Sequence, residues 1–220
     1  MIRVRENSDL KGTDGVKGLA VAHHELSRAL VEQADRRCMS LSNMQAQLSR
    51  CGKDMAVSWD VLLNPTIRIA GCCLSFGLVH STAARFRTIA YGGVRTTKED
   101  AGIPLTSIAF ARQDQAFDLK EEAGRIIEEF QNRAKGFRYT IEGLKASHLN
   151  EDEATKTLLE ASRDDLIPWS RIGLAEQWFR QGRNKSKWDL AVALSLAAQR
   201  GAPLRQMALV HSFIYDYLGV

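Results

Sequence analysis

The fold class of this chain is decided by a short stretch with a two-residue period, Met55-Ala-Val-Ser-Trp-Asp-Val-Leu-Leu63. Every second residue from Met55 to Leu63 is apolar, which is the pattern of a strand with one buried face. Asn64-Pro65 then predicts a turn, because proline lacks a backbone donor and restricts the residue before it. The apolar run over residues 66–80 is interrupted by Gly71 and Gly77. This run predicts a strand, a bend and a second strand.

The segment that follows completes a predicted sheet over residues 54–117. Residues 86–90 alternate less cleanly, the pair Gly92-Gly93 predicts a turn, and Leu105 to Arg112 predicts a last strand. The connections between these strands are too short to hold crossover helices. We therefore expect antiparallel pairing throughout.

Residues 1–53, on the N-terminal side of this sheet, are predicted to form a helical segment. Apolar residues repeat there at intervals of three and four, as on one face of a helix: Leu19, Ala22, Leu26, Leu30 and Ala34. A second, short helix is expected to begin at Ser42, whose hydroxyl would cap it while Gln45 reaches back. Gly52 would close the segment.

The C-terminal half, residues 118–220, is predicted to be helical. Asp118 and Glu121 have the spacing of a capping box, and apolar residues then hold helical spacing over 119–144, which predicts one long helix. Asn150 and Glu153 would cap the next helix. The sequence thus predicts an α+β protein with N-terminal helices, a central antiparallel sheet and a helical C-terminal half. We expect the three segments to form one continuous domain, since 220 residues can bury a sizeable core.

The composition indicates a cytoplasmic globular protein. The chain carries 30 basic and 26 acidic residues, and 45% of its residues are apolar. Since no apolar run approaches 18 residues, a membrane-spanning helix is not expected, and the start lacks the apolar stretch of a secretory signal. The cysteines, Cys38, Cys51, Cys72 and Cys73, lack the paired spacing of a zinc site. We expect them to be buried free thiols.

No catalytic signature is present, so the chain is expected not to be an enzyme and to hold no metal or cofactor. It lacks a phosphate-binding loop, a dinucleotide fingerprint, a nucleophile elbow and a zinc-protease motif. His23 and His24 are adjacent and cannot share one helix face to form a metal clamp. The acidic run Glu151-Asp-Glu153 stands at a predicted helix start, where it offsets the helix dipole. A site assembled from distant residues remains an alternative.

The best binding signal lies late in the chain, where four cations occur within eight residues that include no acid: Arg180, Arg183, Lys185 and Lys187. Such side chains neutralise phosphates, and nearby aromatic rings can stack on unpaired bases. Trp178 is the expected stacking residue, since Trp188 follows the capping residue Ser186 and fits better in the core. The sequence therefore predicts a nucleic-acid-binding protein that prefers single strands. The alternative is a solvated connector between two helices.

Arg85 and Arg87 form a second basic candidate, which would extend the phosphate-binding surface predicted for the four late cations. The two residues would share one face of a strand, with Arg95 and Lys98 in the loop that follows. They could equally be the charged solvent face of an edge strand, which protects the sheet from aggregation. An exposed sheet edge could also pair two copies of the chain, so a homo-oligomer is a possible state.

The alternative function rests on the acidic character of residues 118–168, which hold 12 acidic and 8 basic side chains. Four carboxylates of the predicted long helix could mimic phosphates or dock on a basic groove: Glu121, Glu122, Glu128 and Glu129. In that case the chain would be an anti-defence protein that binds and blocks a host nuclease or CRISPR-type complex. A solvated helix face is the ordinary interpretation of the same charges.

Three segments resemble a known family: Leu74-Ser-Phe-Gly-Leu-Val79, Ile108-Ala-Phe-Ala-Arg112 and Trp188-Asp-Leu-Ala-Val-Ala-Leu-Ser195. Together they are similar to a phage- and plasmid-borne family known as domain of unknown function 932, over roughly residues 55–215. The chain departs from that pattern at Leu74, Phe76 and Val192, where the family has Cys, Asn and Asn. The resemblance implies an accessory protein of a phage or plasmid, and it supplies no catalytic residue.

Overall fold

A five-stranded antiparallel sheet organises the computed structural model, which describes residues 21–63, 67–83, 88–110, 118–164 and 166–199. The strands lie side by side in chain order. They are β1 (Met39–Leu48), β2 (Asp54–Leu63), β3 (Cys72–Ser81), β4 (Ile89–Thr96) and β5 (Gly102–Ala109). The helices are α1 (His23–Arg36), α2 (Leu119–Ala134), α3 (Phe137–Ala146), α4 (Glu151–Arg163), the 3-10 turn η1 (Trp169–Arg171), α5 (Ile172–Gln181) and α6 (Lys187–Gln199).

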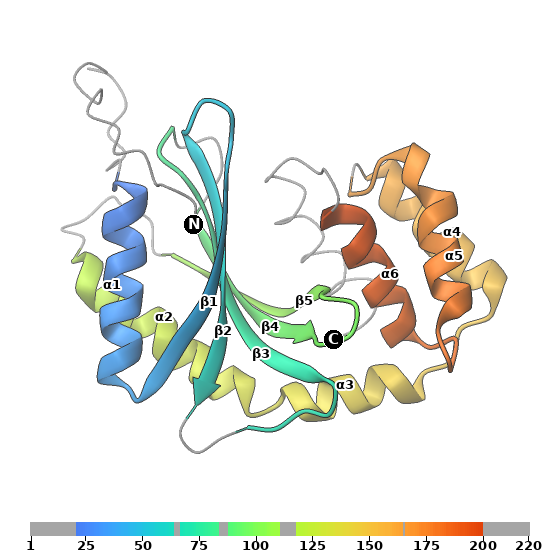
Figure 1. The fold of residues 1–220 in the computed structure, drawn as a ribbon, viewed down its shortest axis with the longest axis horizontal. Helices are drawn as coiled ribbons and strands as arrows, with labels where there is room; N and C mark the ends of the chain where they lie inside the picture. Colours follow the sequence, from blue (N-terminus) through green and yellow to red (C-terminus); the bar gives the residue numbers. More distant parts are fainter. Residues whose placement is uncertain (1–20, 64–66, 84–87, 111–117, 165, 200–220) are drawn as a thin grey trace.

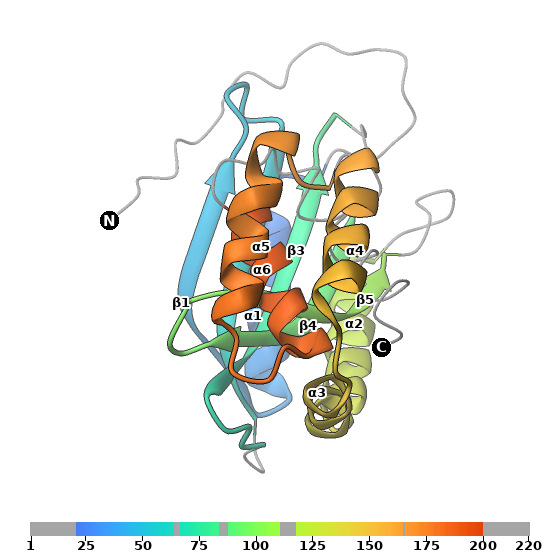
Figure 2. The ribbon, with the colours of Figure 1, turned by 90° about the vertical axis from the view of Figure 1, so that its right-hand side faces the viewer.

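The helices form two groups on opposite sides of the sheet (Figures 1 and 2). Helices α1 and α2 pack together and cover one face, while α4, α5 and α6 lie beyond the other. Helix α3 runs between the two groups (Figure 1). The predicted α+β class is confirmed, with helices both before and after the sheet in the sequence.

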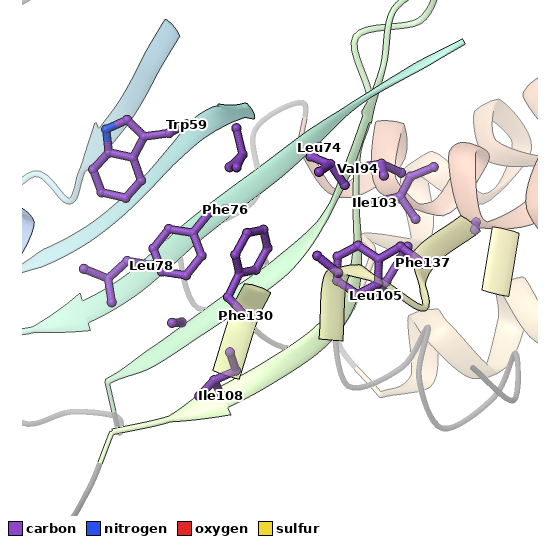
Figure 3. Packing of buried hydrophobic residues seen from close by; sticks show 14 of the residues in the cluster. Trp59, Leu74, Phe76, Leu78, Val94, Ile103, Leu105, Ile108, Phe130 and Phe137 are labelled. Atoms are coloured by element: carbon purple, nitrogen blue, oxygen red, sulfur yellow. The ribbon is translucent and has the colours of Figure 1, made fainter. Parts of the chain in front are cut away.

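The main core lies between the sheet and α2 (Figure 3). Trp59, Phe76 and Gly92 are register partners on neighbouring strands, so they share one face. The ring of Phe130 from α2 packs on Phe76 at 5.1 Å between centroids. It lies over Gly92, where a Cβ atom would come within 2.5 Å of it. Glycine is therefore required at this position by the close approach of the helix.

The pair Gly92-Gly93 does not form the predicted turn, because it lies inside β4. A Cβ on Gly93 would meet the carbonyl oxygen of Ile103 on the adjacent strand at 2.1 Å. The two glycines admit a helix and a neighbouring strand rather than a reversal of the chain. Gly77 likewise lies within a continuous β3, which replaces the predicted pair of strands.

The short helix predicted at Ser42 is wrong, because residues 39–48 form the edge strand β1. The sheet thus begins within the segment 1–53 that was predicted as helical. A bulge between Ser42 and Gln45 shifts the pairing register with β2. Leu41 and Ala46 therefore point to the same face although they are five positions apart, an odd number. The bulge thus hides the two-residue period.

The long helix predicted over 119–144 is two helices, since α2 ends at Ala134 and α3 begins at Phe137. Gly136 is the N-cap residue of α3. The predicted caps at Asp118 and Asn150 are confirmed. Asp118 accepts from the backbone N–H of Lys120 at 2.8 Å, and Asn150 accepts from that of Glu153 at 2.8 Å.

All four cysteines are free, as predicted, but they are not buried. Cys38 and Cys51 are exposed, and Cys72 and Cys73 are half-buried at the start of β3. Among the described residues, no helix has the length and apolar character needed to cross a bilayer.

Candidate functional site

The predicted cationic residues lie where α5 connects to α6, over residues 180–187, here named the basic loop. Arg180 is in the last turn of α5, Arg183 and Lys185 are in the connection itself, and Lys187 is the first residue of α6. The N–H of Leu149 donates to the carbonyl of Lys185 at 2.8 Å, and the N–H of Lys187 donates to that of Ser147 at 2.8 Å. His148 Nδ1 lies 2.9 Å from the carbonyl oxygen of Asn184. The connection between α3 and α4 thus holds the basic loop in place.

Lys185 adopts a backbone conformation that is uncommon for a residue with a side chain. Its φ angle is +45°, in the left-handed region. The backbone hydrogen bonds at Lys185 and Lys187 hold the chain in this conformation. Strain of this kind is concentrated at functional sites.

Glu151, at the start of α4, pairs with two of the four cations of the basic loop and leaves the three groups with a net charge of +1. Its carboxylate lies 2.6 Å from Lys185 Nζ and 3.2 Å from Arg180 Nε. The hydrogen bond from Lys185 is the main reason that the pKa of Glu151 is lowered. Arg183 is exposed and makes no ion pair with any residue that the structure describes. The site therefore offers one open guanidinium beside two cations already held in position.

The tryptophans near the basic loop differ in exposure. Trp188 is buried, with Lys145 Nζ 5.2 Å from its ring centroid, which agrees with the core role expected for it. Trp178 is half-buried and packs against the edge of the core. Trp169 is 64% exposed but precedes α5, so the length of that helix, about 15 Å, separates it from the basic loop. Trp178 remains the aromatic residue beside the cations that solvent can reach.

The second basic candidate falls partly on residues that the structure does not describe. Arg85 and Arg87 lie outside the described residues. Arg95, which was expected in a loop, lies in β4 and is clamped between two carboxylates. Its Nε donates to Asp60 at 2.8 Å and its Nη1 to Asp100 at 2.5 Å. Arg95 is therefore already neutralised.

The acidic face considered for phosphate mimicry is partly neutralised as well. Glu122 is buried and pairs with Arg125 at 2.6 Å. Glu129 pairs with Arg125 at 2.8 Å and also with Arg133. Glu121 and Glu128 are exposed. Ion pairs within α2 thus occupy half of this carboxylate set.

The histidines do not form a metal site within the described part of the chain. His23 packs edge-on against His80, with ring centroids 5.0 Å apart, and not against His24. Burial lowers the pKa of both His23 and His80. No group of three or more His, Cys, Asp or Glu side chains in the described ranges is arranged to hold a metal ion.

No family model, curated protein or solved structure matches this chain.

Proposed function

We propose that this protein binds nucleic acid through the basic loop, with a preference for single strands. The observation that carries the proposal is the backbone anchoring of the basic loop, which presents Arg183 to solvent beside Arg180 and Lys185. Cations whose backbone is already fixed lose less conformational entropy when they bind phosphate. The resemblance of three segments to a phage- and plasmid-borne family supports an accessory role in a mobile element.

Binding at this site requires an exchange of partners at Glu151. In the free protein, this carboxylate holds Arg180 and Lys185. An incoming phosphate would contact Arg183 first and then compete with Glu151 for the other two cations. Glu151 thus positions Arg180 and Lys185 and also limits affinity. The preference for single strands rests on Trp178, because only unpaired bases offer a face for stacking.

Fluorescence anisotropy tests the proposal, with labelled single- and double-stranded DNA and RNA at about 50 and 200 mM salt. If Lys187 completes a set of four phosphate contacts, affinity for single strands should fall about fifty-fold over this range. The charge reversal Arg183→Glu with Lys185→Glu should abolish most of the binding. The matched control is Arg28→Glu with Lys120→Glu, which makes the same change in net charge on α1 and α2, across the sheet from the basic loop.

The two double variants separate a local site from a general charge effect. Unchanged affinity in the basic-loop variant would remove this loop from the account. An equal loss of affinity in both variants would show that only net charge matters.

A further inference from the structure

A cavity of about 310 Å³, lined by both polar and apolar residues, lies on the sheet face opposite α2. The floor of the cavity comes from residues of all five strands, and Ser195 and Ala198 of α6 form one wall. Because α6 belongs to the helix group beyond this face (Figure 1), the cavity lies between the sheet and that group. We name it the sheet cavity. None of the residues of the basic loop lines it.

Ser195, a residue of the cavity wall, carries a buried polar atom without a partner in the described part of the chain. The residue is 1% exposed, and its Oγ has no hydrogen-bond partner among the described residues. Serine in a helix interior commonly bonds back to the carbonyl four residues earlier, but Ser195 does not. A buried hydroxyl left without a partner costs free energy, so it favours any ligand that supplies one.

Tyr91 supplies an aromatic surface in the same cavity. Its ring lies over Gly77 of β3, where a Cβ atom would come within 2.1 Å of Tyr91 Cζ. The glycine thus makes room for the ring to lie against the sheet, and the ring also lines the cavity. Burial raises the pKa of the Tyr91 phenol, so it stays protonated at neutral pH. A planar ligand could stack on this ring.

The charged groups of the sheet cavity already satisfy one another. Asp60 accepts from Arg95 at 2.8 Å and from Asn43 Nδ2 at 2.8 Å, and Arg95 also pairs with Asp100. The hydrogen bond from Arg95 is the main reason that the pKa of Asp60 is lowered, so this carboxylate stays ionised. The three charges sum to −1, which disfavours a phosphate, and the excess negative charge falls on Asp100, whose side chain is 63% exposed to solvent.

Neutral hydrogen-bonding groups line the sheet cavity together with Tyr91. The amides of Gln45 and Gln47, on the same cavity wall as Asn43, provide both donors and acceptors. The hydroxyls of Ser58 and Ser75 lie on the cavity floor. A stacking ring, amide groups and an unpartnered hydroxyl together suit a flat molecule that carries hydrogen-bonding groups on its edge.

From this arrangement we propose that the sheet cavity binds a planar, uncharged heterocycle with donors and acceptors on its edge, which is the chemistry of a nucleobase. The heterocycle stacks on Tyr91 and contacts the Oγ of Ser195. It comes either from a free nucleoside or from an unpaired base of a bound strand. The proposal does not depend on the basic loop, because a nucleoside carries no phosphate.

Isothermal titration calorimetry tests this site with adenosine, guanosine, cytidine and uridine at millimolar concentrations. The variant Ser195→Ala should weaken binding about three- to ten-fold, the equivalent of one lost hydrogen bond. It should leave the melting temperature unchanged or raise it, because a buried unsatisfied hydroxyl is removed. The matched control is Ser162→Ala, which removes the other buried serine hydroxyl without a partner, located in α4 outside the cavity lining. This control should not change nucleoside affinity.

A second set of titrations distinguishes the two sources of the heterocycle. Single strands with all bases are compared with strands of the same length that carry abasic sites. Nucleoside binding that survives Arg183→Glu with Lys185→Glu indicates a free nucleoside ligand. Binding of intact strands alone, weakened both by abasic sites and by Ser195→Ala, indicates a base of a bound strand.

Three results would overturn the proposal. The first combines two observations. No nucleoside gives a measurable heat of binding, and the affinity for oligonucleotides changes neither when bases are removed nor in Ser195→Ala. The second is an equal effect of Ser195→Ala and Ser162→Ala on binding. The third is nucleoside affinity unchanged by Tyr91→Leu, which removes the stacking ring and should weaken binding at least five-fold.

Discussion

Replacing Gly92 by alanine should destabilise the protein through a clash with one aromatic ring. The added Cβ would lie 2.5 Å from Cδ2 and 2.7 Å from Cε2 of Phe130, whereas carbon atoms in contact normally stand about 3.5–4.0 Å apart. Phe130 is fully buried between Phe76 at 5.1 Å and Phe137 at 6.2 Å, so its ring has no space into which to move. Overpacking of this kind costs about 2–3 kcal/mol.

Thermal and urea unfolding measure this cost. Gly92→Ala should lower the melting temperature by about 5–10 °C for a chain of this size. The matched control is Gly143→Ala in α3, where a Cβ would meet nothing within 4 Å. That substitution should stabilise the helix by about 0.5–1 kcal/mol.

A double-mutant cycle identifies Phe130 as the cause of the clash. Phe130→Leu alone should cost about 1–2 kcal/mol. In combination with Gly92→Ala, the total should fall short of the sum of the single costs by at least about 1 kcal/mol, since a smaller side chain makes room for the methyl group. Additive costs, or a Gly92→Ala variant as stable as the parent, would refute the packing described for β4 and α2.

Two further predictions concern titration and helix capping. Because burial lowers the folded-state pKa of His23 and His80, the unfolded chain binds more protons than the folded one just below pH 6.5. The free energy of unfolding should therefore be level above about pH 6.5 and fall as the pH drops below it. Urea unfolding across pH 5.5–8 measures this fall, which should be smaller in His80→Gln than in the parent protein. Asn150→Ala removes a reciprocal cap with Glu153 and should cost about 1 kcal/mol in chemical unfolding, whereas Asp152→Ala at the same helix start should cost less. Equal costs for the two substitutions would argue against the cap.

The sequence predicts the class of the fold well where one element has one uniform period. Strand β2 is such a case, because Met55 to Leu63 alternate without interruption and the strand is paired on both sides. Strand β1 fails the same test, since its bulge places two residues opposite one of β2 and breaks the alternation. Most side chains of β1 are also exposed, so few apolar core residues mark the strand in the sequence.

Glycines misled the prediction for a different physical reason. Gly77 and Gly92 give room to the rings of Tyr91 and Phe130, which come from other elements. A sequence shows that a glycine is present, but not whether it serves a turn or a close approach from a distant residue. Only the tertiary structure distinguishes the two.

The cations of the candidate site could be found from the sequence, but their partner could not. Arg180, Arg183 and Lys185 form a run without acids, and this run lies in the basic loop. Glu151 is about 30 residues away in the sequence and reaches the basic loop only because the chain between α3 and α4 bonds to that loop. The orphan hydroxyl of Ser195 gives no signal in the sequence, since its burial depends on the placement of α6.

The salt dependence of single-strand affinity, compared between the parent and Glu151→Gln, tests the central claim most directly. Removing this carboxylate frees Arg180 and Lys185 for phosphate while leaving every cation in place. The account predicts tighter single-strand binding by Glu151→Gln at both salt concentrations, because phosphate no longer competes with the carboxylate. The slope of log affinity against log salt should stay near about −2.8 in both proteins, since the same four cations contact phosphate. Equal affinities for the two proteins, or no binding by either at low salt, would contradict it.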